Sequence, residues 1–322
     1  MGVINVNPST MFLPLTAAYL LHVFALQALA LYGPPDGAIT VGPGGKHANL
    51  SAAMKDTSSS VYFVFSGTFQ EQVVITRPNI KIFGQTKAPQ SFSGNTVSIT
   101  NNLPASVAGS NDASGTVQVH ATNVSLYNLN IANTYGKPVD QSQAIALSVE
   151  SGQFGGYGLK LTGFQDTLLA NKGPQFYSNC WIEGAVDFIF GMQASIWITQ
   201  STINTISSGC ITASGRSSDD PNWYVIDNSV VQGTGKTPLG RPWRDFARVV
   251  FQNTFLDHNV PASGWSPWSS TTPQTDHVTF AEFNNTGPGA TGPRASFASQ
   301  LTSPVSISTV LDSISWIDPA FL

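Results

Sequence analysis

The stretch Leu126-Tyr-Asn-Leu-Asn-Ile131 has an apolar residue at each end and an asparagine in the third position. The chain repeats this pattern, with Asn or Gln in the third position, at Tyr177-Ser-Asn-Cys-Trp-Ile182, Ile198-Thr-Gln-Ser-Thr-Ile203, Ile226-Asp-Asn-Ser-Val-Val231 and Phe251-Gln-Asn-Thr-Phe-Leu256. A weaker copy has Gly158 in that position, and the third positions are then 30, 21, 21, 28 and 25 residues apart. Periods of roughly 20 to 50 residues are typical of solenoids, propellers and repeat arrays. A steady motif at variable intervals predicts stacked coils that carry insertions.

The repeated segments are short and strand-sized, which favours an all-β solenoid over helical repeats. An amide at each turn can bond backbone groups that the bend leaves unpaired. We expect Val61–Phe65, Val73–Ile75 and Ile80–Phe83 to form the first coils. The alternative is a β-sandwich whose turns happen to carry asparagine. No long linker divides the chain, so residues 31–322 are expected to form one domain, with the tail after Asn284 packed over one face.

The composition limits the classes of function. The chain has 322 residues, of which 41% are hydrophobic and 10% are charged, and its formal net charge is -4. Such a balance gives no reason to expect a nucleic acid or an anionic membrane as a partner. The scarcity of Glu and Lys also disfavours a helix-rich fold, because these residues usually fill exposed helical faces.

The N-terminus has the features of a targeting segment. Residues 12–31 are almost wholly apolar, and Ala28-Leu29-Ala30 has small residues at the two positions that a signal peptidase reads. We predict a signal peptide at residues 1–30, with Met11 as an alternative start, and a secreted, extracellular protein. The competing interpretation is a membrane anchor, because about 20 apolar residues are enough to span a bilayer.

Two further features bear on secretion. Asn-x-Ser/Thr sequons occur at Asn49, Asn123 and Asn284, which would make the secreted protein a glycoprotein. Cys180 and Cys210 could form a disulfide in an oxidising compartment, provided that they lie on adjacent coils. The equally supported alternative is two buried thiols that behave as small apolar side chains.

Asp166 and Asp187 are 21 residues apart, which is the length of one coil in this part of the chain. Residues one coil apart in a parallel β-helix stack at roughly 4.8 Å, so the two carboxyl groups should lie side by side. Two like charges at this separation cannot both ionise cheaply. One aspartate is therefore expected to stay protonated while the other carries the charge, as a general acid beside a nucleophile.

Three more polar side chains are expected near this pair. Gln143 precedes Gln165 by 22 residues, and Gln165 precedes Asp187 by 22. Arg241 comes two to three coils later and could reach Asp187 from the side. An arginine there would hold that aspartate ionised and leave its neighbour as the acid.

These motifs together resemble those of the pectin methylesterase (pectinesterase) family, in its fungal secreted form. The resemblance rests on Gln143-Ala-Ile-Ala-Leu147, Gly163-Phe-Gln-Asp-Thr-Leu168, Phe176-Tyr-Ser-Asn-Cys180, Gly184-Ala-Val-Asp-Phe-Ile-Phe-Gly191 and Leu239-Gly-Arg-Pro-Trp243. Weaker similarities are Gly67-Thr-Phe-Gln-Glu-Gln-Val73, Gly264-Trp265 with Trp268, and Asn285-Thr-Gly-Pro-Gly289. The likeness runs from about residue 38 to the end of the chain, in the order of the family's motifs.

The resemblance implies a right-handed parallel β-helix that removes methyl esters from homogalacturonan without a metal or a cofactor. It implies that Asp187 is the nucleophile and Asp166 the general acid and then base. Gln143 and Gln165 would be oxyanion donors, and Arg241 the partner of Asp187. Trp243 and Trp265 would line the sugar groove. The expected partner is the methyl-esterified pectin polymer, and we expect a monomer.

Other chemistries fit the sequence less well. A polygalacturonan hydrolase or lyase on the same solenoid is the main alternative, because retaining glycosidases also hold two carboxyl groups roughly 5 to 5.5 Å apart. Two amides and an arginine around the pair suit an oxyanion better than an oxocarbenium ion. A serine esterase is disfavoured because no Gly-x-Ser-x-Gly occurs, and the histidines lack zinc-ligand spacing. A non-catalytic carbohydrate-binding solenoid would have to keep the whole set without using it.

Overall fold

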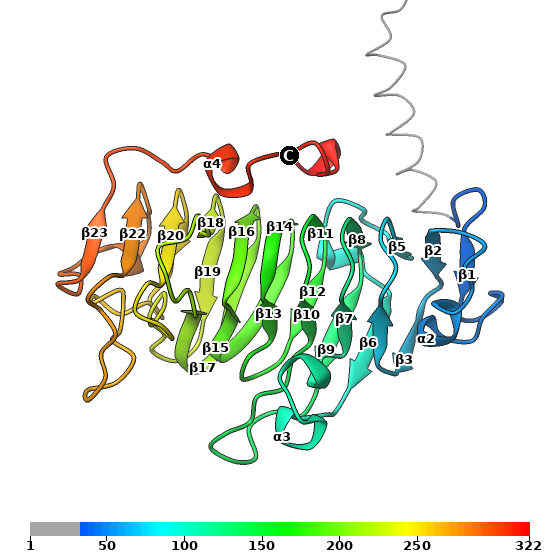
Figure 1. The fold of residues 1–322 in the computed structure, drawn as a ribbon, viewed down its shortest axis with the longest axis horizontal. Coiled ribbons are helices and arrows are strands. Elements are labelled where there is room, and N and C mark those ends of the chain that lie inside the picture. The colour runs from blue at the N-terminus through cyan, green and yellow to red at the C-terminus, as the bar shows by residue number, and fades with distance from the viewer. Residues whose placement is uncertain (1–32) are drawn as a thin grey trace, which may run out of the picture.

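The computed structural model describes residues 33–322, which form a parallel β-helix (Figure 1). Strands of successive coils pair in parallel register and build an 11-stranded sheet and a 12-stranded sheet. The second sheet bends around a corner of the coil, so each full coil presents three faces. The all-β solenoid is confirmed, and the β-sandwich alternative is wrong.

The first face consists of the 11-stranded sheet. Its strands are β1 (Ile39–Val41), β2 (Val61–Val64), β5 (Lys81–Gly84), β8 (Val124–Tyr127), β11 (Phe154–Tyr157), β14 (Lys172–Ser178), β16 (Gln193–Thr199), β18 (Tyr224–Asp227), β20 (Arg248–Gln252), β22 (Thr279–Phe283) and β23 (Ala298–Gln300). The expected first coils correspond to β2, β5 and, on the third face, β4 (Val73–Ile75).

The other two faces share the 12-stranded sheet. The second face consists of β3 (Gly67–Gln70), β6 (Val97–Asn101), β9 (Asn130–Asn133), β12 (Lys160–Thr162), β19 (Val230–Gly233) and β21 (Phe255–Leu256), with the first parts of β15 (Trp181–Gly191) and β17 (Thr202–Ser214). The third face consists of β4, β7 (Val117–Val119), β10 (Leu147–Val149) and β13 (Leu168–Ala170), with the later parts of β15 and β17.

Helical segments are short and lie between or beyond the strands. They are the α-helices α2 (Leu50–Ala53), α3 (Ala105–Ala108) and α4 (Ile307–Leu311), and the 3-10 turns η1 (Phe92–Gly94), η2 (Asp112–Ser114), η3 (Pro288–Ala290) and η4 (Pro319–Phe321). Within residues 33–322, no helix is both long and apolar enough to cross a bilayer. The predicted signal peptide at residues 1–30 lies outside the described part of the chain.

The repeat motif builds the core because its two apolar ends point inside the coil. The first positions stack in register as Leu126, Gly156, Tyr177, Ile198, Ile226 and Phe251. The last positions stack as Ile131, Leu161, Ile182, Ile203, Val231 and Leu256. Burying one such aliphatic side chain contributes roughly 1.5–3 kcal/mol relative to leaving it exposed.

The third position of the motif is the corner between the first two faces. Asn128, Gly158, Asn179, Gln200, Asn228 and Asn253 all have φ between 43° and 58°. This left-handed conformation favours glycine and asparagine, which explains the residue types at this position. At Asn128 the side chain bonds the backbone as expected, since its Nδ2 donates to the Ser91 carbonyl at 3.1 Å.

Farther along the chain, the residue after the corner takes over this hydrogen bonding. The Ser201 hydroxyl accepts from the Cys180 N–H at 3.0 Å and donates to the Thr199 carbonyl at 2.7 Å. Ser229 repeats the arrangement one coil later by accepting from the Ser201 N–H at 3.2 Å. In this part of the chain, hydroxyl groups thus bond the backbone at the bends, where the sequence predicted the amides to do so.

The cysteines are two separate buried thiols. Cys180 is a member of the same internal ladder, and its Sγ donates to the Ser178 carbonyl at 3.3 Å. Cys210 lies in β17, where it pairs with Val186 of the neighbouring strand. Burial raises the pKa of each thiol to about 12. Cys180 and Cys210 are not bonded to each other, so the disulfide alternative is wrong.

The C-terminal tail crosses the outside of the first face, as expected (Figure 1). Residues 301–322, with α4 and η4, run back from β23 over this sheet. Aromatic and aliphatic side chains that point outward from the strands meet apolar side chains of the tail. This cluster contains Tyr127, Tyr157, Phe176, Trp197, Val225, Val250, Ala281, Val310, Leu311, Ile317 and Phe321.

Candidate active site

Asp166 and Asp187 occupy equivalent corners on successive coils, where the second face turns into the third. Gln165 pairs with Val186, and Leu168 of β13 pairs with Ile189 of β15, so the two aspartates lie opposite each other. Asp166 has a φ of 67° and Asp187 a φ of 51°, which is the left-handed conformation that aspartate tolerates better than most residues. Backbone geometry of this kind is often found at functional sites.

Arg241 reaches this corner because its segment continues the same stack of strands. Residues 239–243 run alongside the end of β17, where the Arg241 N–H donates to the Thr212 carbonyl at 3.0 Å. Thr212 in turn pairs with Ile189 of β15. Arg241 therefore lies two coils beyond Asp187, at the near end of the predicted range.

The Arg241 guanidinium binds Asp187 through both carboxylate oxygens. Its Nε donates to Oδ1 at 2.8 Å and its Nη2 to Oδ2 at 2.6 Å. Bidentate, charge-assisted bonds of this type favour the ionised carboxylate. The same hydrogen bonds raise the pKa of Arg241 above its usual value.

Asp166 has a different environment. The side chain is 6% exposed, and its carboxyl has no hydrogen-bond partner among residues 33–322. Burial, reinforced by the nearby charge of Asp187, raises the pKa of Asp166 well above its usual range. Two carboxyl groups on adjacent coils thus have unequal environments, one buried without a hydrogen-bond partner in residues 33–322 and the other bound by an arginine.

The two glutamines flank Asp166 in different ways. The Gln165 Oε1 accepts from the Ser142 N–H at 3.0 Å and from the Lys137 ammonium at 2.9 Å. Within residues 33–322, the Gln143 side chain bonds one neighbouring side chain, since its Nε2 donates to Gln141 Oε1 at 2.7 Å. The structure brings both amides to the aspartate pair, and it leaves the Gln165 nitrogen available for a ligand.

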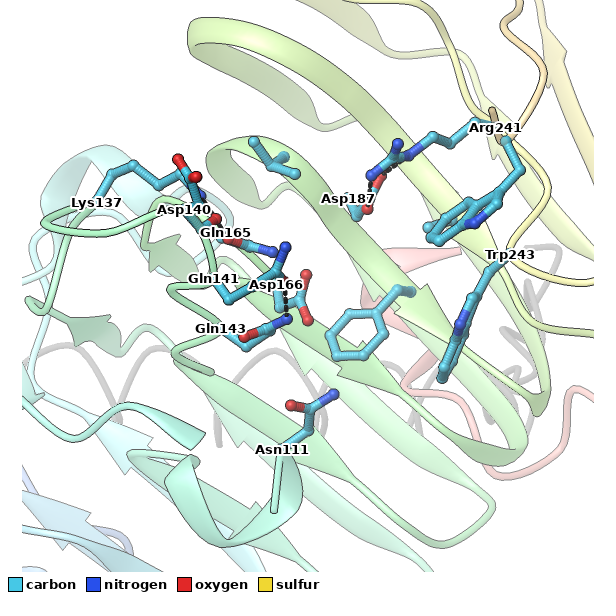
Figure 2. A pocket seen from close by; sticks show the side chains of 14 residues that line it. Asn111, Lys137, Asp140, Gln141, Gln143, Gln165, Asp166, Asp187, Arg241 and Trp243 are labelled. Atoms are coloured by element: carbon cyan, nitrogen blue, oxygen red, sulfur yellow. Dashed lines mark hydrogen bonds and ion pairs between the residues drawn. The ribbon is translucent and has the colours of Figure 1, made fainter. Parts of the chain in front are cut away.

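These side chains line one cavity of about 270 Å³ (Figure 2). Its walls consist of Asn111, Lys137, Asp140, Gln141, Gln143, Gln165, Asp166, Val186, Asp187, Phe190, Ala213, Arg241, Trp243 and Trp268. Figure 2 shows Lys137, Gln165 and Gln143 on one side of Asp166, with Asp187, Arg241 and Trp243 on the other. All five residues predicted to take part in the chemistry therefore lie at one place.

Trp243 lines the cavity as expected. Its ring lies against the backbone of Gly215, where an added Cβ would be 2.5 Å from Trp243 Cε3, so only glycine permits this approach. The ring also lies near that of Phe190, with the two centroids 6.1 Å apart. The two rings form an apolar wall next to the carboxyl groups.

The expectation that Trp265 lines the groove is wrong. Trp265 is 1% exposed and stacks inside the coil on Phe280, with centroids 4.4 Å apart, and its Nε1 donates to buried Glu282. Trp268 lines the cavity instead, and its ring centroid lies 4.3 Å from the guanidinium carbon of Arg241. The sequence motif located the right turn, but it could not show which of its two tryptophans points outward.

Sequence reasoning also missed the loop at residues 134–142, which contributes Lys137, Asp140 and Gln141 to the cavity. The loop joins β9 to β10, and the 30-residue interval between Asn128 and Gly158 is the signal that marked an insertion here. A long loop beside a predicted site was therefore visible, although its residues were not assigned a role.

In the described part of the chain, no group of three or more His, Cys, Asp or Glu side chains is arranged to hold a metal ion. The groups that line the cavity include carboxyl, amide, guanidinium and ammonium groups. A carboxyl group held by an arginine, a second carboxyl group whose pKa is raised by burial, and two amides suit attack on an ester carbonyl. This set of groups on a parallel β-helix is the arrangement that a carboxylic ester hydrolase would need.

Comparisons with known proteins identify the family within this class. The sequence model of the Pectinesterase family matches residues 44–302, and the chain belongs to the pectinesterase family. A pectinesterase from Aspergillus niger is 40% identical, with 93% of this chain and 97% of the relative covered. A pectinesterase from Aspergillus aculeatus is 42% identical with the same coverage.

Solved structures give the same result for the fold. The crystal structure of a pectin methylesterase from Aspergillus niger has a TM-score of 0.84 and 36% identity, and it covers 89% of this chain and 98% of its own. The structure of a pectin methylesterase from carrot has a TM-score of 0.77 at 24% identity and supports the fold alone.

Proposed function

We propose that this chain hydrolyses the methyl esters of homogalacturonan and releases methanol, with Asp187 as the nucleophile. Asp166 is the general acid and then the general base. Gln165 and Gln143 donate hydrogen bonds to the oxyanion, and Arg241 keeps Asp187 ionised. Membership of the pectinesterase family supports the substrate, and the geometry of the cavity supports the roles.

In the first half-reaction, a carboxylate oxygen of Asp187 attacks the ester carbonyl carbon of a methylated galacturonate. The carbonyl oxygen becomes an oxyanion, which the amide N–H groups of the glutamines stabilise. Asp166 gives its proton to the departing methoxide, so methanol leaves and an anhydride joins the substrate to Asp187.

In the second half-reaction, the ionised Asp166 takes a proton from a water molecule. The resulting hydroxide adds to the acyl carbon, and the bond to Asp187 breaks. Asp187 becomes a carboxylate again, Asp166 is protonated again, and the product is a galacturonic acid unit. The sum is one ester and one water converted to one acid and one methanol.

The observation that carries this proposal is the unequal treatment of two neighbouring aspartates. Asp187 has both oxygens bound by Arg241, whereas Asp166 is buried with no hydrogen-bond partner within residues 33–322. A nucleophile must be ionised and a general acid must be protonated, so each environment suits one of the two roles. Trp243 and Phe190 add an apolar wall on which a sugar ring can stack.

Methanol release from highly methylated pectin tests the proposal, with wild type compared with Asp187→Asn. We expect kcat to fall by about 10⁴-fold or more, because removing a nucleophile abolishes the covalent pathway. Asp276→Asn is the matched control, since Asp276 is exposed and lies outside the cavity. Chain length should stay constant throughout. Near-normal methanol release by Asp187→Asn, or chain shortening by wild type, would contradict the proposal.

We also propose that the protein is secreted after cleavage behind Ala30 and that it is glycosylated. Asn284 is the most exposed of the three sequon asparagines. N-terminal sequencing and glycopeptide mass spectrometry of protein from the culture medium test both points. Recovery of the protein only in the membrane fraction with residues 12–31 intact would favour the anchor instead.

A further inference from the structure

The loop at residues 134–142 lines one side of the cavity and holds one of its glutamines. Lys137 directs its ammonium to Gln165 Oε1, at 2.9 Å, and to the carbonyl of Asp140 in its own loop. Ser142 adds its N–H to the same Gln165 oxygen at 3.0 Å, and its hydroxyl donates to the Val139 carbonyl at 2.7 Å. The loop is thus tied to itself and to Gln165 (Figure 2).

Two donors on one amide oxygen fix the orientation of the Gln165 side chain. A carbonyl oxygen has two lone pairs, and here both have a partner. The nitrogen end of the amide must then face the cavity, where Nε2 has no hydrogen-bond partner in the described residues. The donor that an oxyanion needs is therefore in place before the substrate arrives.

Gln143 provides a useful contrast, because nothing in the described chain holds its oxygen in this way. Its Nε2 donates to the exposed side chain of Gln141 at 2.7 Å. One of its two amide N–H groups is therefore engaged by a surface side chain, and the orientation of the amide depends on that exposed partner. The two amides differ in preorganisation, and the difference lies in the contacts to Lys137 and Ser142.

We propose that Lys137 is a positioning residue for ester hydrolysis, which acts by holding and polarising the Gln165 amide. The inference rests on the proposed role of Gln165 as an oxyanion donor. A positive charge on the amide oxygen draws electron density from the nitrogen and makes its N–H groups stronger donors. The effect grows as negative charge develops on the substrate, so it favours the transition state over the bound ester.

Lys137 also contributes to the electrostatics of the proposed general acid. The charges that face Asp166 are Asp187, which raises its pKa, and Arg241 and Lys137, which lower it. Asp140 lies on the wall of the same cavity. Removing the charge of Lys137 should raise the pKa of Asp166 further, which moves the alkaline limb of the activity profile to higher pH.

The test compares Lys137→Met, Lys137→Arg and the control Lys172→Met, whose lysine is exposed and outside the cavity. We expect Lys137→Met to lower kcat roughly tenfold with little change in KM, an effect in the range of coupled neighbours. Its alkaline limb should move to higher pH. Lys137→Arg should restore most of the rate and the original limb, and Lys172→Met should match wild type. Thermal melting confirms that each variant is folded.

A double-mutant cycle with Gln165→Ala decides whether Lys137 acts through the glutamine. If it does, Lys137→Met should have little further effect on kcat once Gln165 is gone. Additive losses would overturn the role of Lys137 but leave the proposed oxyanion hole intact. The same holds if Lys137→Met has an unchanged kcat while Gln165→Ala is strongly impaired. A Gln165→Ala enzyme with normal kcat would instead contradict the proposed oxyanion hole itself.

Discussion

The same coils present two outward faces that differ in what covers them. We call the outside of the 11-stranded sheet under residues 301–322 the covered face. We call the outside of β4, β7, β10 and β13, with the later parts of β15 and β17, the open face. On the covered face, Phe176, Trp197 and Val225 stack in register and are sealed by the tail. On the open face, Leu169, Phe190 and Ala213 stack in register and lead to a cavity.

The backbone is not what separates the two faces. Asn179, at the corner beside the covered face, has a φ of 56°, and Asp187, at the corner beside the open face, has a φ of 51°. The two corners share one conformation and differ in the residue that adopts it. The corner at Asn179 carries an amide, whereas the corner at Asp187 carries a carboxyl group, which can act as an acid or a nucleophile. Changes on the open face should therefore affect catalysis, and changes on the covered face should affect stability.

After Asp187→Asn, the largest expected effect is that of Asp166→Asn on the open face. Loss of the general acid and base should lower kcat by about 10³-fold, or about 4 kcal/mol, as methanol release would measure. The variant should remain folded, because Asp166 makes no hydrogen bond to residues 33–322 that the substitution would break. A fully active Asp166→Asn enzyme would contradict the claim that the open face carries the catalytic groups.

The same variant should also differ from wild type in how its free energy of unfolding depends on pH. The folded-state pKa of Asp166 is raised, so between the ordinary aspartate range and that raised value the folded protein keeps a proton that the unfolded chain has lost. The stabilisation is complete below the ordinary range and disappears as pH rises through the raised pKa. Asparagine does not titrate, so the free energy of unfolding of wild type relative to Asp166→Asn should fall over this window. A pH-independent difference in chemical denaturation would contradict the assignment.

The next largest effect is expected on the covered face, from Phe321→Ala. The Phe321 ring is 4% exposed and lies 4.7 Å from the Tyr157 ring, centroid to centroid. Truncating it should cost about 3 kcal/mol of unfolding free energy and lower the melting temperature by several degrees. Because the tail does not touch the cavity, kcat and KM at a temperature where the variant is folded should equal those of wild type. A selective loss of kcat would show that the two faces are coupled.

Much of this architecture was predictable from the sequence, because the features that define it recur. The apolar ends of the motif had to point to one interior, and its third position had to be a bend. The 21-residue step from Asp166 to Asp187 placed the two carboxyl groups on adjacent coils. The contact between Arg241 and Asp187 was predictable from the number of residues per coil, since the segment of Arg241 continues the stack beyond β17.

Features that do not repeat were not predictable. The turn from Gly264 to Trp268 lies outside the coil pattern, so no periodicity distinguishes the buried Trp265 from Trp268 at the cavity. The contact between Lys137 and Gln165 depends on the path of an inserted loop, which has no register with its neighbours. Side chains on insertions are fixed by tertiary contacts, and a single sequence does not encode those contacts in its spacing.

The smallest expected effect comes from two arginine–tryptophan pairs of similar geometry. On the open face, Trp268 lies 4.3 Å from the guanidinium of Arg241, and beside the covered face, Trp223 lies 4.5 Å from that of Arg248. A partly exposed cation–π pair contributes roughly 0.5–1 kcal/mol. Trp268→Ala should loosen the arginine that holds Asp187 and lower kcat/KM about fivefold, which is about 1 kcal/mol.

Trp223→Ala is the matched control for this substitution. Its arginine pairs with Asp219 and not with a residue of the cavity, so we expect a lower melting temperature and an unchanged kcat/KM. The reverse pattern, with Trp223→Ala impaired in catalysis and Trp268→Ala only in stability, would mean that position relative to the two faces does not determine function. Equal and small losses from both substitutions would show that Arg241 needs no more than its two bonds to Asp187 to stay in place.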